Sequence, residues 1–291
     1  MSSPEELIAQ ADKKCAPVGG FAKFFGGSSL YRFEEAADLY IQAANLYRIQ
    51  KQYVKAGNLF EKASEAQKKA ESIDESGSTL IDAFKSYRED SPQDAARVLK
   101  EAIKIFTTRG QFRRAANFKM DLAAIYEDSL NDLSEATQHY EQAGDWYSSD
   151  QAQALANKAY VKAADLGALA GNYIQAAALY ESVAKKSLNN NLSKWSLKDY
   201  FFKSILCYLA ADDMVAAKKT LDKFIDWDGS FQQTRECILL NDLFEAISDR
   251  DGQVFADKLY EFDQFSKLDK WKTTILLKIK SSIVEADDDI L

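Results

Sequence analysis

The chain has 291 residues, of which 46% are hydrophobic and 28% charged, and its formal net charge at pH 7 is −8. This composition is typical of a folded, soluble protein, and its negative charge makes nucleic acid a poor partner. No apolar run approaches the roughly 20 residues of a transmembrane helix, and the polar, acidic start (MSSPEELIAQADKK) does not resemble a signal peptide.

The three cysteines, Cys15, Cys207 and Cys237, are scattered along the chain and form no CxxC pair. This spacing argues against a disulfide framework or a zinc site and favours a reducing compartment. The sequence therefore predicts a cytoplasmic protein without a metal or cofactor.

The first predicted helix begins near residue 4. Ser3, Pro4 and Glu6 have the pattern of an N-cap, a first-turn proline and a capping-box acid. Residues 91–94 (SPQD) repeat this arrangement and predict a second helix start of the same kind.

A glycine-flanked segment, VGGFAKFFGGSSLY, follows at residues 18–31. Its paired glycines predict a flexible surface loop that carries Phe21, Phe24 and Phe25. Each phenylalanine would gain roughly 1.5–3 kcal/mol if it were fully removed from water, and less at an interface. The residues alone leave two alternatives open: the loop contacts a membrane weakly, or it folds back onto the first hairpin.

An eight-residue template repeats through most of the chain. It has small residues at its ends, an apolar residue at position 4 and a bulky residue at position 5, which share one face of an α-helix. The copies start at residues 36, 56, 76, 95, 115, 136, 156 and 176. The step is 20 residues with slips of one, and the copy near residue 115 is degraded. A step of this length leaves about 16 residues of helix and about four of turn.

Two steps make a helical hairpin of about 40 residues, which is longer than a tetratricopeptide repeat but of the same kind. The sequence therefore predicts an all-α fold, a right-handed α-solenoid of tetratricopeptide-like antiparallel hairpins over residues 1–200, with the apolar loop at 18–30. The template then fades, with one late copy at Ala217, Leu221 and Phe224. Residues 201–285 predict a C-terminal helical bundle, and residues 286–291 an acidic tail.

The net charge is −5 over residues 1–150, +4 over residues 151–203 and −7 over residues 204–291. Such a distribution favours different partners on different surfaces. Lys158 and Lys162 lie in the basic stretch one helical turn apart and therefore face the same way.

Catalytic motifs are missing from the sequence. The single histidine, His139, falls on an interior template position and is better explained by packing than by catalysis. No nucleophile motif, phosphate-binding loop or metal-ligand cluster accompanies it. The sequence predicts a scaffold and not an enzyme.

Several stretches resemble the α-type soluble NSF attachment proteins (α-SNAPs), most of all the yeast members. In chain order they are YRFEEAADLYIQAANLYR, AIKIFTTRGQFRRAANFK, HYEQAGDWY, LSKWSLKDYFFKSILC, TRECILL and LDKWKTTILLKIK, followed by an acidic end that closes in leucine. The resemblance runs end to end. It implies an adaptor that binds the four-helix SNARE bundle left after membrane fusion and recruits and stimulates the hexameric AAA+ ATPase NSF, which disassembles the bundle during vesicle-mediated transport such as ER–Golgi transport.

The resemblance also implies three surfaces on a protein that is peripheral on the cytosolic face of membranes. Membrane contact is implied for the apolar loop, at Phe21, Lys23, Phe24 and Phe25. SNARE contact is implied for the basic residues Lys51, Arg113, Arg114, Lys119, Lys158, Lys162 and Lys198. NSF binding and activation are implied for Asp213, Glu245, Asp249, Asp287, Asp288, Asp289 and Leu291.

The sequence departs from the family pattern at two positions. Asn117 stands where animal members carry a lysine, so Arg113, Arg114 and Lys119 are expected to substitute for it. Ser248 replaces one acid of the NSF surface, which predicts a weaker patch there.

Two other functions remain as alternatives. A tetratricopeptide-type peptide clamp, such as a chaperone cofactor, would need a Lys/Arg/Asn pocket for a carboxylate terminus and would not need the apolar loop. An enzyme with an unrecognised helical fold would show turnover.

Overall fold

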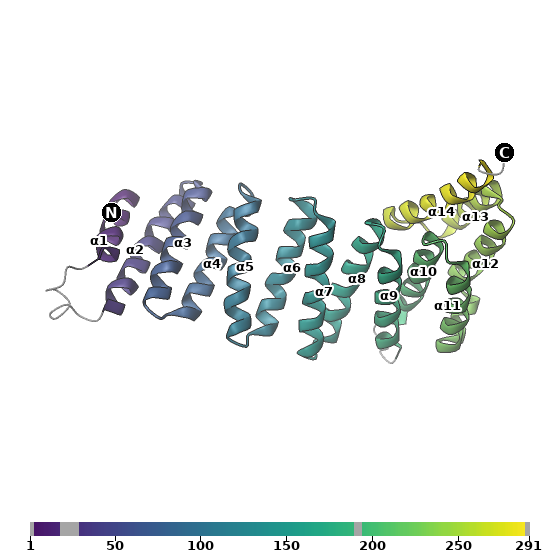
Figure 1. The fold of residues 1–291 in the computed structure, drawn as a ribbon, viewed down its shortest axis with the longest axis horizontal. Coiled ribbons are helices and arrows are strands. Elements are labelled where there is room, and N and C mark those ends of the chain that lie inside the picture. Colours follow the sequence, from purple (N-terminus) through teal and green to yellow (C-terminus); the bar gives the residue numbers. More distant parts are fainter. Residues whose placement is uncertain (1–2, 18–28, 189–193, 289–291) are drawn as a thin grey trace. The chain divides into compact units, whose positions relative to one another are not determined.

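A computed structural model describes residues 3–17, 29–188 and 194–288. Over these ranges the chain forms fourteen α-helices and one short 3-10 helix, and no strand. The helices are α1 (Pro4–Cys15), α2 (Ser29–Ile49), α3 (Tyr53–Lys69), α4 (Ile73–Tyr87), α5 (Pro92–Thr108), α6 (Phe112–Asp128), α7 (Leu133–Ser149), α8 (Gln153–Leu169), α9 (Tyr173–Ser187), α10 (Lys194–Ala210), α11 (Met214–Trp227), η2 (Gly229–Gln233), α12 (Arg235–Ser248), α13 (Gly252–Phe265) and α14 (Lys270–Asp288). Successive helices run antiparallel, which confirms the prediction of all-α, tetratricopeptide-like hairpins (Figure 1).

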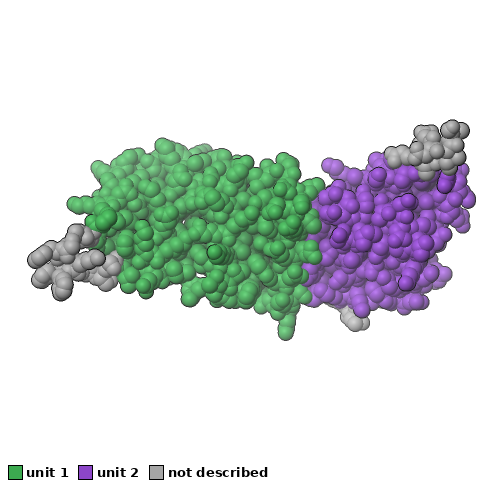
Figure 2. Space-filling model, in the orientation of Figure 1, with its two compact units in different colours: residues 1–152 green, residues 153–291 purple. Residues whose placement is uncertain are grey.

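The chain divides into two compact units, residues 1–152 and 153–291 (Figure 2). Unit 1 contains α1–α7, and each of these helices packs against the next along the chain. Unit 2 contains α8–α14, and α8 and α9 share one hydrophobic core with the later helices. The predicted boundary at residue 200, which marks the end of the sequence repeat, stays a prediction.

The template explains how neighbouring helices pack. In α3, Ala56 and Ala63 have no exposed surface, and Phe60 between them is 1% exposed. The alanines allow the backbones to approach closely, and the aromatic ring fills the space between the two contacts. The late copy of the template is buried in the same way, since Ala217 and Phe224 of α11 are both fully enclosed.

Most turns between helices close with one backbone motif. A residue two or three positions past the end of the helix adopts a left-handed φ, between 53° and 88°, and the next N–H donates back to the helix, as from Ser72 N to Gln67 O at 2.9 Å. This is the Schellman motif, in which glycine is the usual left-handed residue. Glycine fills the position at Gly110 and Gly171. Other residues fill it at Lys51, Glu71, Asn131, Gln151, Asp212 and Arg250.

One of the two predicted helix caps is wrong. Ser3 and Glu6 form the reciprocal capping box at the start of α1, as predicted, with Glu6 N donating to Ser3 Oγ at 3.2 Å. At the start of α5, however, the Ser91 hydroxyl donates to Asp94 Oδ2 at 2.7 Å and does not cap the helix. The helix still begins at Pro92 with Ser91 as its N-cap residue, but the hydrogen bond that the hydroxyl donates to the carboxylate orients the side chain so that its oxygen accepts from no backbone N–H.

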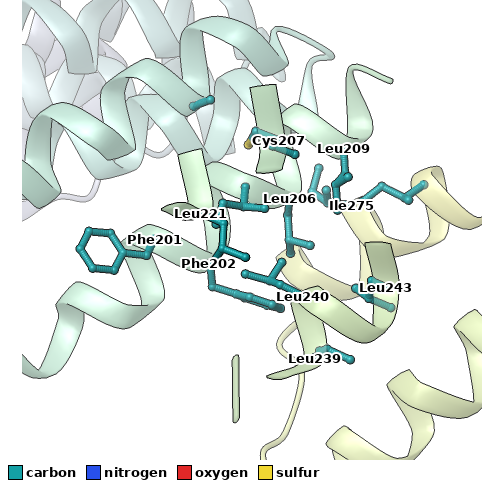
Figure 3. Close-up of a cluster of buried hydrophobic side chains, with 14 of the residues drawn as sticks. Phe201, Phe202, Leu206, Cys207, Leu209, Leu221, Leu239, Leu240, Leu243 and Ile275 are labelled. Atoms are coloured by element: carbon teal, nitrogen blue, oxygen red, sulfur yellow. The ribbon is translucent and has the colours of Figure 1, made fainter. Parts of the chain in front are cut away.

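Helix α10 is the central element of unit 2. Phe201, Phe202 and Leu206 have no exposed surface, and helices α9, α11, α12 and α14 surround α10 (Figure 3). Residues 201–207 of α10 are buried on every side of the helix, so this stretch cannot show the one-sided pattern from which the template was read.

A buried ionic cluster attaches α14 to α8 and α10. Lys203 is only 7% exposed, its Nζ lies 2.8 Å from Asp165 Oδ1, and it sits 4.8 Å from the centre of the Trp271 ring. The Trp271 indole N–H donates to the carbonyl of Asp165 at 2.9 Å, and Lys272 Nζ lies 2.6 Å from Asp199 Oδ1. Because a buried charge is tolerated only when it is paired, this cluster fixes where α14 begins.

Helix α14 continues to Asp288, so the first residues of the predicted tail, 286–288, are helical. Its face with Trp271, Ile275, Ile279 and Ile283 is buried, as the sequence predicts. Among the described residues, no helix is both long and apolar enough to cross a membrane.

His139 is packed, as predicted, and is 7% exposed. Its ring centre lies 5.3 Å from that of Tyr126, and its Nε2 lies 3.5 Å from Glu135 Oε2. Burial, and after it the positive charges of Lys119 and Lys100, lowers the pKa of His139 to about 4. The imidazole is therefore neutral in the folded protein at neutral pH.

We expect His139 to make the protein less stable as the pH falls below 6.5. The unfolded histidine titrates near pH 6.5 and the folded one near pH 4, so the unfolded chain binds more protons between these values. The stabilisation is complete above pH 6.5, and about 2 kcal/mol of it is lost by pH 5. Urea unfolding at pH 7 and pH 5 should show a larger loss for the wild type than for His139→Gln. An equal loss of unfolding free energy in both proteins would contradict the lowered pKa of His139. The carboxylates titrate in both proteins, so their contribution cancels in this comparison.

The left-handed turns predict the effect of three glycine substitutions. Gly110→Ala and Gly171→Ala should each cost about 1 kcal/mol of unfolding free energy, since an added Cβ contacts nothing within 4 Å but is unfavourable at a positive φ. Gly229→Ala is the matched control, because its Cβ also meets open space and its φ is not positive. If thermal unfolding shows the same loss of stability for all three variants, the left-handed conformation at Gly110 and Gly171 is contradicted.

Candidate functional site

Part of the predicted site lies outside the described residues. This holds for Phe21, Lys23, Phe24 and Phe25 of the apolar loop and for Asp289 and Leu291 at the C-terminus. Asp287 and Asp288 occupy the last turn of α14. The remaining predicted residues lie on described helices and turns, in both units.

The basic residues of α6 do not share one face. Arg114 packs its guanidinium 4.0 Å from the centre of the Phe106 ring and donates to Ser78 Oγ at 3.1 Å. Arg113 forms an ion pair with Asp150, the residue that ends α7. Both arginines therefore have internal partners.

Lys119 projects from α6 roughly 240° around the helix axis from Arg113, since six residues separate them. It is half-buried, and its Nζ lies 5.4 Å from the centre of the Trp146 ring. Burial, and then the nearby charge of Lys100, lowers the pKa of Lys119. One flat partner surface cannot contact Arg113 and Lys119 together.

Lys51 occupies a turn and not a helix face. It is the left-handed residue between α2 and α3, with φ 59°, and its side chain is exposed. A partner that runs along the helices would meet it only at their ends.

Lys158 and Lys162 meet the geometric prediction best. They lie one turn apart on α8, and Lys158 is exposed while Lys162 is half-buried. The alanines of the template, Ala156, Ala159 and Ala163, are fully buried and turn the lysine-bearing side of α8 outward. The α8 face therefore presents two positive charges to a partner.

Lys198 already has an ionic partner. Its Nζ lies 2.8 Å from Glu236 Oε1, which joins α10 to α12. Half of the Lys198 side chain is exposed, whereas only 15% of that of Glu236 is. An acidic partner would have to compete with Glu236 for this lysine.

Two of the predicted acids line an open groove of about 480 Å³ between α11 and α12. Glu245 and Asp249 lie one turn apart at the end of α12, whose last turn carries no basic residue, and Lys218 of α11 lines the same groove. Negative charge at a helix C-terminus is unfavourable for the helix, so these acids do not serve its stability. Ser248, which replaces a family acid, donates its hydroxyl to Phe244 O at 2.7 Å and so is directed back to its own helix.

Asp213 has a structural role of its own. It caps α11, accepting a hydrogen bond from Ala216 N at 2.8 Å. Lys218 of α11 lines the groove, whereas Asp213 does not. One carboxylate oxygen of Asp213 is therefore already engaged by its own helix.

The sequence did not single out the cluster of Asp165, Lys203 and Trp271. Its members come from three helices, and Trp271 lies 106 residues after Asp165. The signals available were a lysine within the apolar stretch YFFKSILCYL and a tryptophan directly after a helix start. Among the described residues, no group of three or more His, Cys, Asp or Glu is placed to hold a metal ion.

Comparison with known proteins identifies the family of the chain. The family profile "Soluble NSF attachment protein, SNAP" matches residues 2–284. A vesicular-fusion protein, SEC17, of Komagataella phaffii is 54% identical over 290 residues, covering 99% of this chain and 98% of that protein. The alpha-soluble NSF attachment protein of Saccharomyces cerevisiae is 49% identical over 292 residues, covering all of both chains. The human protein of the same name is 35% identical over 285 residues, covering 98% of this chain and 96% of the human chain. The chain therefore belongs to the soluble NSF attachment protein (SNAP) family.

Proposed function

We propose that this protein is an adaptor that binds assembled SNARE complexes and recruits and stimulates the hexameric ATPase NSF. The SNAREs are thereby disassembled and recycled in vesicle and organelle membrane fusion. The observation that carries the proposal is the family match over residues 2–284, and the names of the relatives, vesicular-fusion and NSF attachment proteins, support it. In this role the protein activates an ATPase, has no catalytic site of its own, and works at the cytosolic face of membranes.

The SNARE-binding surface is centred on Lys158 and Lys162. An acidic helical bundle is attracted by exposed lysines, and this attraction speeds and orients its docking. Lys51, Arg113 and Lys198 add positive charge at sites where internal partners or turn positions reduce their contribution. Arg114 and Lys119 act mainly through their packing.

The NSF-binding surface consists of the groove acids and the acidic end of the chain. Glu245 and Asp249, together with Asp213, attract basic residues of the ATPase. Asp287, Asp288 and Asp289 extend the negative charge, and Leu291 supplies a small apolar contact that stimulates hydrolysis.

Membrane contact is assigned to the apolar loop, through Phe21, Phe24 and Phe25 together with Lys23, which can meet anionic headgroups. The affinity from this loop is weak by itself, since three partly inserted rings gain only a few kcal/mol, from which the cost of ordering the loop is subtracted. Simultaneous SNARE binding makes a weak membrane contact effective.

A disassembly assay tests the proposal directly, with purified SNARE complex, NSF and ATP, with and without this protein. Lys158→Glu/Lys162→Glu should reduce capture of the SNARE complex about tenfold at moderate salt, because two attractive contacts become repulsive. Disassembly should fall in parallel at limiting concentrations. If the wild-type protein neither captures the complex nor accelerates its disassembly, the adaptor function is wrong and the peptide-clamp alternative is favoured instead.

Flotation with liposomes tests the apolar loop separately. Phe21→Ser/Phe24→Ser should remove most of the protein from the lipid fraction, since two of the three apolar side chains are lost, while SNARE capture in solution stays unchanged. Unaltered flotation of the folded variant would remove membrane contact from the loop.

A further inference from the structure

We propose that the outer face of α14 binds the same acidic helical partner as Lys158 and Lys162. This inference rests on the proposed SNARE-binding function and adds a second helix to it. The outer face of α14 is the exposed row Lys270, Thr274, Leu277, Lys278 and Ser281.

Helix α14 starts on the side of α8 that carries the two lysines. Asp165 follows Lys162 by three residues and Lys158 by seven, so the three side chains share one face of α8. Lys203 contacts both Asp165 and the Trp271 ring, and the Trp271 N–H donates to Asp165 O. The first turn of α14 therefore lies next to the lysine row, since Lys162 and Asp165 are only about 5 Å apart along the helix axis.

The exposed row of α14 faces away from the core of unit 2. Trp271, Ile275 and Ile279 lie on the opposite side of the helix and are at most 8% exposed. Because this apolar side is turned toward α8 and α10, the row with Lys270 and Lys278 lies on the side of α14 that faces away from these helices, and the first turn of α14 starts beside the lysine row of α8. A rod that lies along Lys158 and Lys162 would continue onto α14.

The charges of α14 are arranged against its helix dipole. Lys270 and Lys272 occupy the first turn, and Asp287 and Asp288 the last. Each position is the unfavourable one for that charge. Lys272 is paired with Asp199, but neither Lys270 nor Lys278 forms an ion pair with another described residue. At the start of the helix the Asp269 carboxylate accepts from Lys272 N at 2.8 Å and so offsets part of this cost, whereas Lys270 and Lys278 have no such partner among the described residues. Ammonium groups without an internal partner fit an acidic partner.

Leu277 adds an apolar contact to the row. It is 59% exposed and stands between the two lysines, one turn before Ser281. An exposed leucine beside lysines can supply the apolar centre of an interface whose rim is charged. With its N-terminal half on that bundle and its last turn leading into the NSF-binding end, one helix would contact both partners.

The test compares Lys270→Glu/Lys278→Glu with a charge-matched control in the full-length chain. The control, Lys185→Glu/Lys186→Glu, makes the same change in net charge at exposed positions of α9 outside the row. Capture of purified SNARE complex should weaken about fivefold for the α14 variant at about 0.1 M salt and less than twofold for the control. The unfolding midpoint of the α14 variant should not fall, because a glutamate in the first turn suits the helix dipole.

The possible failures can be told apart. If Lys158→Glu/Lys162→Glu weakens capture but Lys270→Glu/Lys278→Glu does not, this inference is wrong and the proposed function stands. If the wild-type protein captures no SNARE complex, the proposed function itself fails. If the α14 variant loses liposome flotation and retains full capture, the row binds lipid and the inference is again overturned.

Discussion

The close approach of neighbouring helices is the constraint on which the rest of the structure depends. Small residues at both ends of each template copy bring one backbone against the next, and a bulky residue locks the pair. At Gly57 of α3 even a methyl group is excluded, because an added Cβ would lie 2.6 Å from the Tyr87 ring of α4. Helices held in this way leave their outward faces free, so charged side chains on those faces can serve partners without a cost to the core.

The sequence predicted the helical hairpins because the contacts that build them are periodic and local. It failed where the position of a side chain depends on residues far along the chain, or on which of several partners the side chain binds. Arg114 is a basic residue in a basic stretch, yet Phe106 and Ser78 draw it into the array. The left-handed turns were missed because lysine, glutamate or arginine often occupies the position of glycine. The attachment of α14 joins Asp165 to Trp271, and no local pattern reveals such a pair.

Many candidate binding residues also have partners within the protein. Lys198 is paired with Glu236, Arg113 with Asp150, and Asp213 caps a helix. An external partner gains from such residues only the difference between two ion pairs, which is small. Lys158, Glu245 and Asp249 are better placed, because the fold gives them no comparable role. Affinity would then come from several modest surfaces acting together, and each can be released without breaking a very tight contact.

The turns have a consequence for how such an array can change in length. They are closed by main-chain hydrogen bonds, such as Gln52 N to Tyr47 O at 2.9 Å, and tolerate several residue types in the left-handed position. A repeat whose last turn is closed by backbone hydrogen bonds depends little on the amino-acid sequence of the next repeat. Insertion or deletion of a whole hairpin at such a turn would therefore conserve the local geometry. Helical spacers of different lengths could be engineered in this way.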